Sequence, residues 1–562
     1  MRSPSPYAPP AVSGSIDLQL SRNEGRAPRT EPLEQVTIPL TRLSRYPELT
    51  ELKKQLALRF GLPTDRVLLT AGGDDALLRT CLATLSEGQE ALVATPTFEM
   101  IPRYAALTGG SVREVAWPEG AFPIDAMIAA VNERTAVAYV VSPNNPTGAV
   151  ATRLDVQRIA EALPHGLVVL DAAYGEFADD DPTEATLELE NVVVVRTLSK
   201  AWGLAGLRVG CILATRSWVQ RLEASGNPFP VSVSSAAIAL QRLVTGENDV
   251  QDYIAQVAVE RDELATLLRN LGASPAQPAC ANFVLARGVD PGWVTAALAT
   301  QGIAIRAFPD HRELADAVRI TVPGDPIAFA RLQRALASAI RPQALLFDMD
   351  GVLADVSDSY RTAIRKTVAG FGAETNATEI DAAKARGNSN DDWLLTQALL
   401  AQHGLVIPLE EVTARFEELY QGTPQQEALL LRETLLVSRE QLASWRTRYK
   451  LAIVTGRPRK DALRFLERFN LLGEFDAVVC REDALLKPEP APVRLALERL
   501  GVCSAWMLGD TPDDIGAARS AGVIPIGVIA PGADPMRARS NLERAGAARV
   551  LDRVTELEGL FS

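Results

Sequence analysis

Short apolar runs and longer amphipathic stretches alternate along the chain in two separate series. In the first series the runs are rich in β-branched residues, and most are apolar on both faces. Such runs are typical of strands buried between helix layers, so they predict a mainly parallel α/β sheet. The expected strands are 67–70, 91–95, 136–142, 167–171, 192–197 and 209–214.

The second series begins directly after a helical stretch that ends near Ile340. It predicts another mainly parallel sheet, with a mostly helical insertion at about 357–445 between its first two strands. The expected strands are 344–347, 451–455, 477–480, 505–509 and 524–528.

These two series indicate the domain boundaries. The first half covers residues 15–341, with a large α/β domain at about 45–270. A smaller α+β domain is expected from residues 15–44 together with 271–341. The second half covers residues 343–562 and includes the helical insertion as a cap.

Composition and charge narrow the chemistry. Of 562 residues, 47% are hydrophobic and 23% charged, as in an ordinary globular enzyme, and the net charge of −13 disfavours a nucleic-acid or anionic-membrane partner. Three histidines and five scattered cysteines suggest neither a Ser-His-Asp hydrolase nor a zinc or disulfide framework. The first fourteen residues are rich in Pro, Ser and Ala, which predicts disorder. No apolar run is long enough for a signal peptide or a membrane span, so we expect a cytoplasmic protein whose chemistry is carried by lysine and carboxylates.

Lys200 is the first candidate for that chemistry. It follows a predicted strand and is flanked by Gly203 and Gly206, which leave backbone room for a bulky ligand. Thr197 and Arg208 supply a hydroxyl and a cation suited to a phosphate. A surface lysine in a turn would explain this segment equally well by itself.

Three further segments end predicted strands in the same half. They place Asn145, Asp171 with Tyr174, and the pair Gly73-Asp74 at the carboxyl ends of strands, where open α/β sheets bind ligands. The glycines precede a helix whose free N–H groups favour an anion. Separately, these segments could be a turn or a helix N-cap.

Together the four segments resemble the fold-type-I pyridoxal-phosphate (PLP) aminotransferases, over residues 15–341. The resemblance implies that Lys200 forms the Schiff base with PLP and moves the substrate proton. It implies that Asp171 pairs with the pyridinium nitrogen, and that Asn145 and Tyr174 bind the ring 3-oxygen.

The same resemblance implies the remaining contacts to the cofactor. The backbone of Gly73 and Asp74, with the side chains of Thr197 and Arg208, would hold the PLP phosphate. The ring of Phe98 matches the position that stacks on the cofactor.

Within this fold the chain is most similar to histidinol-phosphate aminotransferases and threonine-phosphate decarboxylase. In that comparison Tyr46 would reach the cofactor phosphate of a partner subunit, which implies a homodimer. Arg319 and Arg306 would bind the anionic group of a small phosphorylated substrate, with an amino donor such as glutamate. The family's Asn-Glu-Asn-Pro-Tyr-Gly segment is represented only by residues 22–25, Arg-Asn-Glu-Gly, which departs from the pattern and leaves the substrate open.

Closely spaced carboxylates mark the second half. Asp348 and Asp350 follow the first strand and, being two residues apart in an extended segment, face the same side. Two such carboxylates repel each other unless a cation intervenes, which points to Mg²⁺. Later strand ends add Thr455, Gly456, Lys487, Asp510 and Asp514.

This set resembles the motifs of the haloacid-dehalogenase (HAD) superfamily, over residues 343–562, and implies a Rossmann-like core with a helical cap. By that likeness Asp348 is the nucleophile, and Asp350 protonates the leaving group and then activates water. The phosphoryl group would be held by Thr455, Gly456 and Lys487, and Mg²⁺ by Asp348, Asp350, Asp510 and Asp514.

The sequence therefore predicts a bifunctional enzyme, a PLP aminotransferase of histidinol-phosphate type fused to a Mg²⁺-dependent phosphatase. The phosphatase could act on the aminated product. Two alternatives stay open. Both halves could act on another phosphorylated keto compound in specialised metabolism, or the second half could be a regulatory module without turnover.

Overall fold

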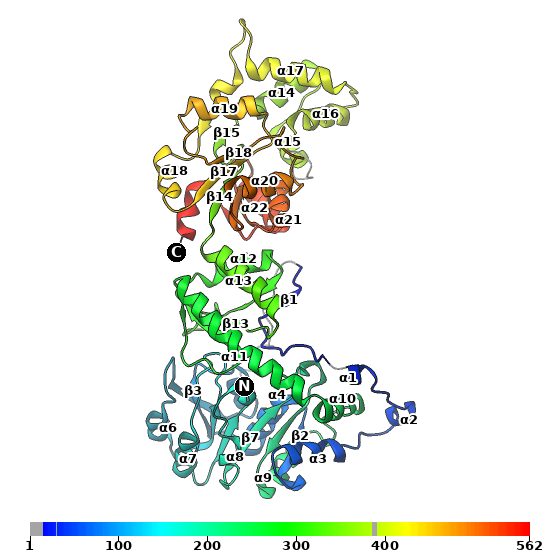
Figure 1. Ribbon diagram of the computed structural model, residues 1–562, viewed down its shortest axis with the longest axis vertical. Coiled ribbons are helices and arrows are strands. Elements are labelled where there is room, and N and C mark those ends of the chain that lie inside the picture. The colour runs from blue at the N-terminus through cyan, green and yellow to red at the C-terminus, as the bar shows by residue number, and fades with distance from the viewer. Residues whose placement is uncertain (1–14, 30, 385–390, 562) are drawn as a thin grey trace. The chain divides into compact units, whose positions relative to one another are not determined.

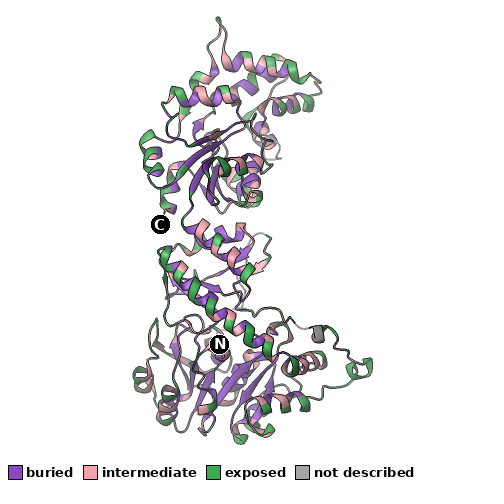
Figure 2. Cartoon of the chain, in the orientation of Figure 1, coloured by how far each residue is buried: buried purple, intermediate pink, exposed green. Residues whose placement is uncertain are grey.

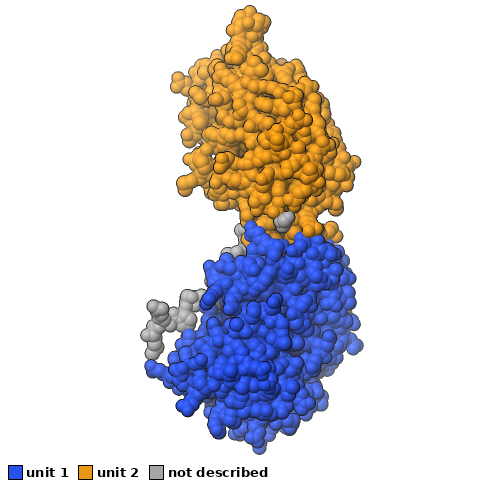
Figure 3. All heavy atoms as spheres, turned by 90° about the vertical axis from the view of Figure 1, so that its left-hand side faces the viewer, with its two compact units in different colours: residues 1–11, 18–291, 305–333 blue, residues 12–17, 292–304, 334–562 orange. Residues whose placement is uncertain are grey.

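The computed structural model describes residues 15–29, 31–384 and 391–561, which form two compact units. The described residues of unit 1 are 18–29, 31–291 and 305–333, and those of unit 2 are 15–17, 292–304, 334–384 and 391–561 (Figure 3). The disorder predicted for residues 1–14 lies outside the described residues. Within the described part of the chain, no helix combines the length and the apolar character that a bilayer span requires.

A seven-stranded sheet forms the centre of unit 1 (Figure 1). Its order is β2-β8-β7-β6-β5-β3-β4, and all neighbours are parallel except β8, which runs antiparallel to β2 and β7. The predicted α/β class with a mainly parallel sheet is confirmed. The strands are β2 (Val67–Thr70), β3 (Glu90–Thr95), β4 (Ser111–Ala116), β5 (Thr135–Val141), β6 (Leu167–Asp171), β7 (Val192–Thr197) and β8 (Gly210–Leu213).

Strand β4 is not among the predicted strands. It lies at the sheet edge, and none of its six residues is fully buried. Its sequence SVREVA therefore lacks the continuous apolar run that identified the inner strands, such as the fully buried Val-Val-Val-Val run of β7.

Helices α4, α5 and α9 pack on the sheet of unit 1. Their buried apolar side chains, including Leu77, Ile101 and Leu222, form one core with strand residues such as Val169 and Val195. The helices named so far are α4 (Gly72–Thr84), α5 (Met100–Leu107) and α9 (Arg216–Ala224). The others in this part of the chain are α1 (Glu31–Glu34), α2 (Leu40–Leu43), α3 (Thr50–Arg59), α6 (Ile124–Ala130), α7 (Arg153–Ala162), α8 (Thr183–Thr186), α10 (Val233–Thr245) and α11 (Glu247–Asn270).

A second, four-stranded antiparallel sheet of order β12-β13-β10-β9 follows α11. Its register places Arg319 on β13 between Leu285 of β10 and Arg306 of β12. The strands of this sheet are β9 (Ser274–Pro275), β10 (Phe283–Arg287), β12 (Arg306–Ala307) and β13 (Val318–Thr321). Four other elements precede or flank them in the chain: β1 (Leu18–Gln19), α12 (Pro291–Thr300), β11 (Ile303–Ala304) and α13 (Pro326–Ile340).

Six parallel strands in the order β18-β17-β14-β19-β20-β21 form the core of unit 2. This confirms the Rossmann-like sheet. The short edge strand β21 was not predicted, because only two of its three residues are apolar, whereas the equally short β18 is apolar throughout. The strands are β14 (Ala344–Phe347), β17 (Lys450–Val454), β18 (Ala477–Val479), β19 (Ala505–Gly509), β20 (Ile524–Val528) and β21 (Arg549–Leu551). The helices are α18 (Arg439–Arg446), α19 (Arg459–Arg468), α20 (Ala491–Leu500), α21 (Pro512–Ser520) and α22 (Pro535–Ala545).

The insertion between β14 and β17 is mostly helical, as predicted. Two short antiparallel strands, β15 (Ala354–Asp355) and β16 (Thr434–Leu435), mark where the chain leaves and re-enters the core. We call the segment between them the cap. Its helices are α14 (Tyr360–Gly370), α15 (Ala377–Lys384), α16 (Asp392–Gln402), α17 (Leu409–Gln421) and the short 3₁₀ helix η4 (Leu429–Arg432).

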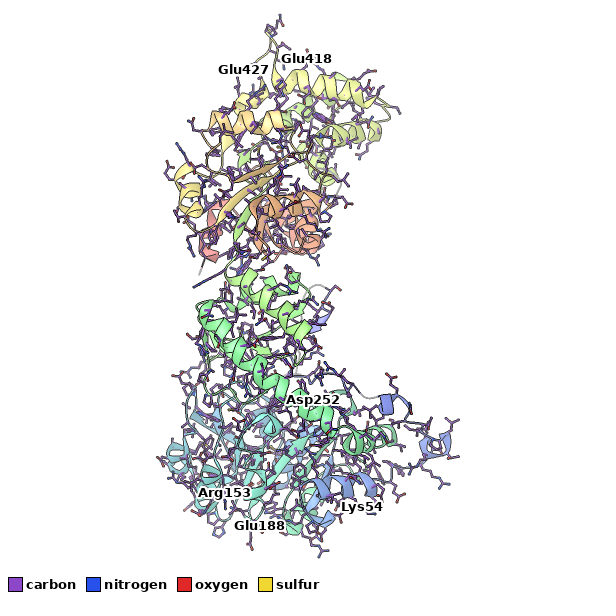
Figure 4. All side chains as sticks on the ribbon, viewed as in Figure 1. Lys54, Arg153, Glu188, Asp252, Glu418 and Glu427 are labelled. Atoms are coloured by element: carbon purple, nitrogen blue, oxygen red, sulfur yellow. The ribbon has the colours of Figure 1, made fainter. Side chains whose placement is uncertain are left out.

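Burial follows the layers in both units. The central strands are buried, whereas the outer faces of the helices are exposed (Figure 2). Charged side chains such as Lys54, Arg153, Glu188 and Asp252 point outward from unit 1, as do Glu418 and Glu427 from the cap (Figure 4).

Candidate active sites

Unit 1 contains a cavity of about 560 Å³ beside the carboxyl ends of β5, β6 and β7. The structure brings together in its lining all but one of the side chains predicted to act in this half, the exception being Tyr46. The predicted residues that line it are Gly73, Asp74, Phe98, Asn145, Asp171, Tyr174, Thr197, Lys200, Arg208, Arg306 and Arg319.

Lys200 lies three residues beyond the end of β7, and its side chain enters this cavity. Its Nζ donates a hydrogen bond of 3.3 Å to the carbonyl oxygen of Arg22 and lies 5.5 Å from the centre of the Tyr174 ring. The amine is therefore held by one long bond to a neutral group, and a carbonyl ligand could displace that bond at small cost.

Asp171 is the last residue of β6 and is buried at the base of the cavity. Burial raises the pKa of its carboxyl group to about 6, and a hydrogen bond of 3.1 Å from the Ala173 backbone N–H acts in the opposite direction. A carboxylate in this situation gains most from a ligand that brings a positive charge or a proton.

An anion cradle lies where α4 begins. Gly72 has a φ of +81°, and a Cβ there would lie 2.8 Å from the Arg208 guanidinium, so glycine allows this close approach. Arg208 in turn pairs with the Asp74 carboxylate at 2.8 Å. The first-turn N–H groups of α4 and the Arg208 cation together favour a phosphate.

Ser199, which the sequence analysis did not select, completes this cradle. Its buried hydroxyl accepts a hydrogen bond of 2.8 Å from Thr197, and both residues line the cavity. Its position one residue before Lys200 is the signal that could have identified it.

Asn23 is a second residue that sequence reasoning missed as a functional group. It is buried in a left-handed conformation, with a φ of 54°, and its Nδ2 donates a hydrogen bond of 3.0 Å to the Tyr174 hydroxyl. Its Oδ1 accepts a hydrogen bond from Thr321. Because Tyr174 accepts from Asn23, its own hydroxyl hydrogen can be donated to a ligand.

Arg319 is held between two oxygen atoms inside the same cavity. It donates to Oδ1 of Asn145 and, at 2.7 Å, to the carbonyl oxygen of Ser21. Arg306 lies 3.4 Å from the Glu99 carboxylate. Both guanidinium groups therefore remain in the cavity lining, where an anionic substrate group could be bound.

Tyr46 lies apart from this cavity. Its side chain is 79% exposed and stacks on Phe229 with ring centres 4.3 Å apart. The structure therefore leaves the predicted role of Tyr46 at a partner's cofactor as a prediction.

Unit 2 gathers carboxylates around one buried lysine. Asp348 directly follows β14, and Nζ of Lys487 lies 2.7 Å from its Oδ1 and 2.5 Å from Oδ1 of Asp514. Carboxylate oxygens of Asp348, Asp510 and Asp514 all lie within 4.8 Å of one another. Gly351, with a φ of +75°, approaches Asp510 so closely that a Cβ would lie 2.5 Å from its carboxylate.

Burial raises the pKa of the Asp348 carboxyl group to about 7, with Lys487 opposing and the neighbouring carboxylates adding to the rise. Burial by itself would lower the pKa of Lys487, but Asp348 and Asp514 raise it above its ordinary value. One ammonium thus pairs with two of three crowded carboxylates, and a divalent cation among them would stabilise the ionised form of Asp348.

The predicted phosphoryl-binding residues lie around the same point, and Asp350 lies beside them. Thr455 and Gly456 follow β17, and Gly456 lines a small cavity with Asp348 and Asp510. Asp350 also lines it, but its carboxylate lies outside the group of three acidic residues and accepts two hydrogen bonds from Arg457. The predicted role of Asp350 as a metal ligand therefore stays a prediction.

Unit 1 has the fold and the site of a fold-type-I PLP enzyme. A lysine, a buried aspartate and an anion cradle lie together at the strand ends of its mainly parallel sheet. Residues 33–335 match the aminotransferase class I and II family, and this chain belongs to that family. Residues 345–528 match the haloacid dehalogenase-like hydrolases. The predicted fusion of the two families is confirmed.

Two relatives and one solved structure illustrate what this chain is similar to. The chain is 33% identical over 333 residues to a histidinol-phosphate aminotransferase of Ruegeria pomeroyi, which covers 58% of this chain and 90% of the relative. It is 45% identical over 223 residues to an imidazoleglycerol-phosphate dehydratase of Phytophthora nicotianae, which covers 38% of this chain but only 48% of that relative, so the chain spans about half its length. A histidinol-phosphate aminotransferase structure from Sinorhizobium meliloti, in complex with PLP, superimposes with a TM-score of 0.53 and 25% identity over 58% of this chain and 91% of the other.

The residues of the unit 1 cavity fit PLP. Lys200 offers an amine, Asp171 a buried acid and the start of α4 an anion cradle, in a cavity of about 560 Å³. These are the three groups that a pyridine ring with an aldehyde and a phosphate requires.

Proposed function

We propose that this chain catalyses two consecutive reactions on one small phosphorylated compound. Unit 1 would transfer an amino group from a donor such as glutamate to a phosphorylated ketone of the imidazole series. Unit 2 would then hydrolyse the phosphate ester of the aminated product, with Mg²⁺. The observation that carries the proposal is the presence of two complete sets of reactive side chains in one chain, one around Lys200 and one around Asp348.

The names of the relatives support the choice of substrate. One is called a histidinol-phosphate aminotransferase and another an imidazoleglycerol-phosphate dehydratase, and both names refer to phosphate esters of imidazole compounds. The cavity of unit 1 is lined by Arg306 and Arg319 from the antiparallel sheet, which suits a substrate with an anionic group.

In unit 1 the chain's own residues would bind, orient and move a proton. Bound PLP would act as an electron sink, and Asp171 would hold its ring nitrogen. Lys200 Nζ, within the same cavity, would remove and return the substrate proton. Tyr174, oriented by Asn23, would donate its hydroxyl hydrogen to the ring oxygen.

In unit 2 the proposed reaction has two halves. Asp348 would attack phosphorus and form an aspartyl-phosphate while the ester oxygen leaves with a proton from Asp350. Asp350 would then take a proton from water as that water attacks the aspartyl-phosphate, which releases inorganic phosphate and restores Asp348. Lys487, with Thr455 and Gly456, would stabilise the charge on the transferring group. Mg²⁺ would be held by Asp348, Asp510 and Asp514.

The cap supplies a reason for preferring the aminated product. Arg361 of α14 and Asp392 of α16 line the small cavity together with Asp348. The lining of this cavity thus includes one cap side chain of each charge, which suits a substrate that carries both a phosphate and an ammonium group. The keto compound lacks that ammonium group.

We also propose that the enzyme is a homodimer. Tyr46 and Phe229 form an exposed aromatic pair in unit 1, and Leu40 and Leu43 of the same N-terminal segment are 81% and 58% exposed. Exposed apolar side chains of this kind are typical of a protein interface. Tyr46 would then reach the cofactor phosphate of the partner subunit.

The test follows the fate of one substrate in the full-length enzyme. Wild-type protein with the imidazole keto phosphate, glutamate and Mg²⁺ should release the dephosphorylated amine and inorganic phosphate. Asp348→Asn keeps the side-chain volume but lacks the nucleophile, so it should accumulate the phosphorylated amine at an undiminished transamination rate. If wild-type kcat/KM for hydrolysis does not favour the amine over the ketone by about tenfold, equivalent to about 1.4 kcal/mol, the consecutive scheme is wrong.

A further inference from the structure

Arg457 connects Asp350, the proton donor proposed for unit 2, to the cap. Its guanidinium group is fully buried, and its Nε and Nη2 donate to Oδ1 of Asp350 at 2.7 and 2.5 Å. Its third nitrogen, Nη1, donates to Oε2 of Glu433 at 3.0 Å. One arginine therefore joins a catalytic carboxylate to a second carboxylate 83 positions away from Asp350 in the sequence.

Glu433 lies where the cap returns to the core, directly before β16. It is 2% exposed, and its Oε1 accepts hydrogen bonds of 3.0 Å from both Ser359 and Tyr420. Ser359 lies near the start of the cap, between β15 and α14, and Tyr420 belongs to α17. A single carboxylate at the end of the cap thus accepts hydrogen bonds from the start of the cap and from one of its helices.

The charges in this cluster are strongly coupled. Burial alone would lower the pKa of Arg457. The carboxylates of Asp350 and Glu433, together with two tyrosines, raise this pKa well above its ordinary value, so the arginine stays charged. The tyrosines are Tyr360 and Tyr420. The guanidinium carbon of Arg457 also lies 5.1 Å from the Tyr360 ring centre and 5.4 Å from that of Phe465. Two carboxylates and two aromatic rings therefore hold the arginine in place, and its position in turn sets that of Asp350.

The position of Arg457 determines how the carboxylate of Asp350 is oriented. Both bonds from Arg457 end on Oδ1, so they fix the rotation of the carboxylate and do not engage Oδ2. Asp350 also lines the cavity that contains Asp348 and Gly456. A fixed carboxylate with one oxygen kept for the substrate is what proton transfer at a defined position requires.

We propose that Arg457 and Glu433 are positioning residues that couple the docked cap to proton transfer by Asp350. With Ser359 and Tyr420 in place, Glu433 holds Arg457, and Arg457 orients Asp350 for the leaving group and the attacking water. Neither residue touches the reacting atoms. The inference rests on the phosphatase activity proposed for unit 2.

The experiment compares two phosphate esters in the full-length enzyme. An alkyl phosphate needs a proton on its leaving oxygen, whereas 4-nitrophenyl phosphate has a leaving group that departs without one. Arg457→Gln should lower kcat for the alkyl ester by about 10²-fold or more, in the range expected for a lost acid catalyst. The first release of nitrophenol in a rapid-mixing experiment should change by less than about threefold. Later turnovers should be slow, because water activation also needs Asp350.

Substitutions at the other residues of the cluster should also lower kcat for the alkyl ester selectively, but by smaller factors. Glu433→Gln removes one charge but keeps an oxygen acceptor, and it should show about a tenfold loss for the alkyl ester. Tyr420→Phe removes one hydrogen bond to Glu433 and should show a few-fold loss. Arg457→Gln combined with Asp350→Asn should behave like Asp350→Asn alone, because the two residues act in one step.

Arg468→Gln is the matched control. Arg468 on α19 also joins the core to the cap, through the carbonyl oxygens of Leu430 and Leu431, but has no contact with Asp350. It should leave the ratio of the two ester activities within twofold of wild type.

Three results would overturn the inference. Equal losses on both esters in Glu433→Gln and Tyr420→Phe would show a merely structural cluster, even if Arg457→Gln does not fold. An unchanged ester ratio in a folded Arg457→Gln protein would show that Asp350 needs no positioning. Wild-type enzyme that hydrolyses neither ester would instead refute the proposed phosphatase, and the inference with it.

Discussion

The carboxylates of the two sites have different partners, although burial raises the pKa of both Asp171 and Asp348. In unit 1, Asp171 is buried at a cavity of about 560 Å³, its partner is a backbone N–H, and its pKa rises to about 6. In unit 2, Asp348 and Asp350 line a cavity of about 40 Å³ and are paired with the buried cations Lys487 and Arg457.

This difference follows from what each site is proposed to bind. A large organic cofactor brings its own positive nitrogen, so unit 1 provides the carboxyl group of Asp171 and a cavity large enough for the cofactor. A phosphoryl group and a metal ion are small and strongly charged, so unit 2 supplies a compact arrangement of both charges in advance. Carboxylates that already pair with a lysine or arginine of the chain thus suit a site for a phosphoryl group and a metal ion. A buried carboxylate without such a pair suits a ligand that brings its own positive charge.

The largest expected effect separates the two sites completely. Lys200→Ala should abolish the visible absorption band that borohydride removes and should lower transamination by at least about 10⁴-fold, because both the cofactor link and the proton carrier are lost. Phosphate release from the phosphorylated amine should stay within twofold of wild type. A band that borohydride still removes from the variant would exclude Lys200 as the cofactor-binding residue.

Metal removal should have the complementary effect. A chelator should lower phosphate-ester hydrolysis by at least about 10³-fold, since Asp348, Asp510 and Asp514 would lose their shared cation, and added Mg²⁺ should restore it. Transamination measured in the same sample should not change. Hydrolysis that persists in the chelator would show that Lys487 alone balances these carboxylates.

The buried carboxyl group of Asp171 should make the stability of the cofactor-free protein depend on pH. The folded-state pKa of Asp171 is raised from 3.8 to about 6, so its ionisation destabilises the folded form as the pH rises through this interval. Asp171→Asn should therefore be more stable than wild type above pH 7, by about 3 kcal/mol, and the gap should close as the pH falls toward 4. Urea unfolding at several pH values measures this, with Asp252→Asn as the exposed control. A gap that does not depend on pH would contradict the assignment of the charge.

The smallest effect concerns substrate choice in unit 2. Asp392→Asn should lower kcat/KM for the phosphorylated amine by about tenfold and leave the value for the keto compound within twofold, because only the amine carries an ammonium group for this carboxylate. Steady-state kinetics with both compounds measures the ratio. Equal losses for both would assign Asp392 to the folding of the cap.

Much of each site could be predicted from the chain because its residues follow buried strands. Lys200, Asp171 and Asn145 come shortly after or at the end of β7, β6 and β5, and Asp348 and Thr455 directly follow β14 and β17. In a parallel sheet the carboxyl ends of neighbouring strands lie at one edge, so motifs far apart in the sequence meet there without any knowledge of side-chain packing. Apolar runs that are buried on both faces made those strands visible.

Tertiary packing alone decided the contacts between segments that share no strand edge. Asn23 meets Tyr174 across 151 positions, and Arg457 joins Asp350 to Glu433, because loops and cap connections fold over the sheet ends. The edge strands β4 and β21 were not predicted, because charged residues interrupt the apolar run in both. The sequence by itself determined which chemical groups stand at the strand ends, because backbone hydrogen bonding sets that arrangement. Which buried partner orients each of them was decided only by the folded structure, because such contacts depend on how distant segments pack in three dimensions.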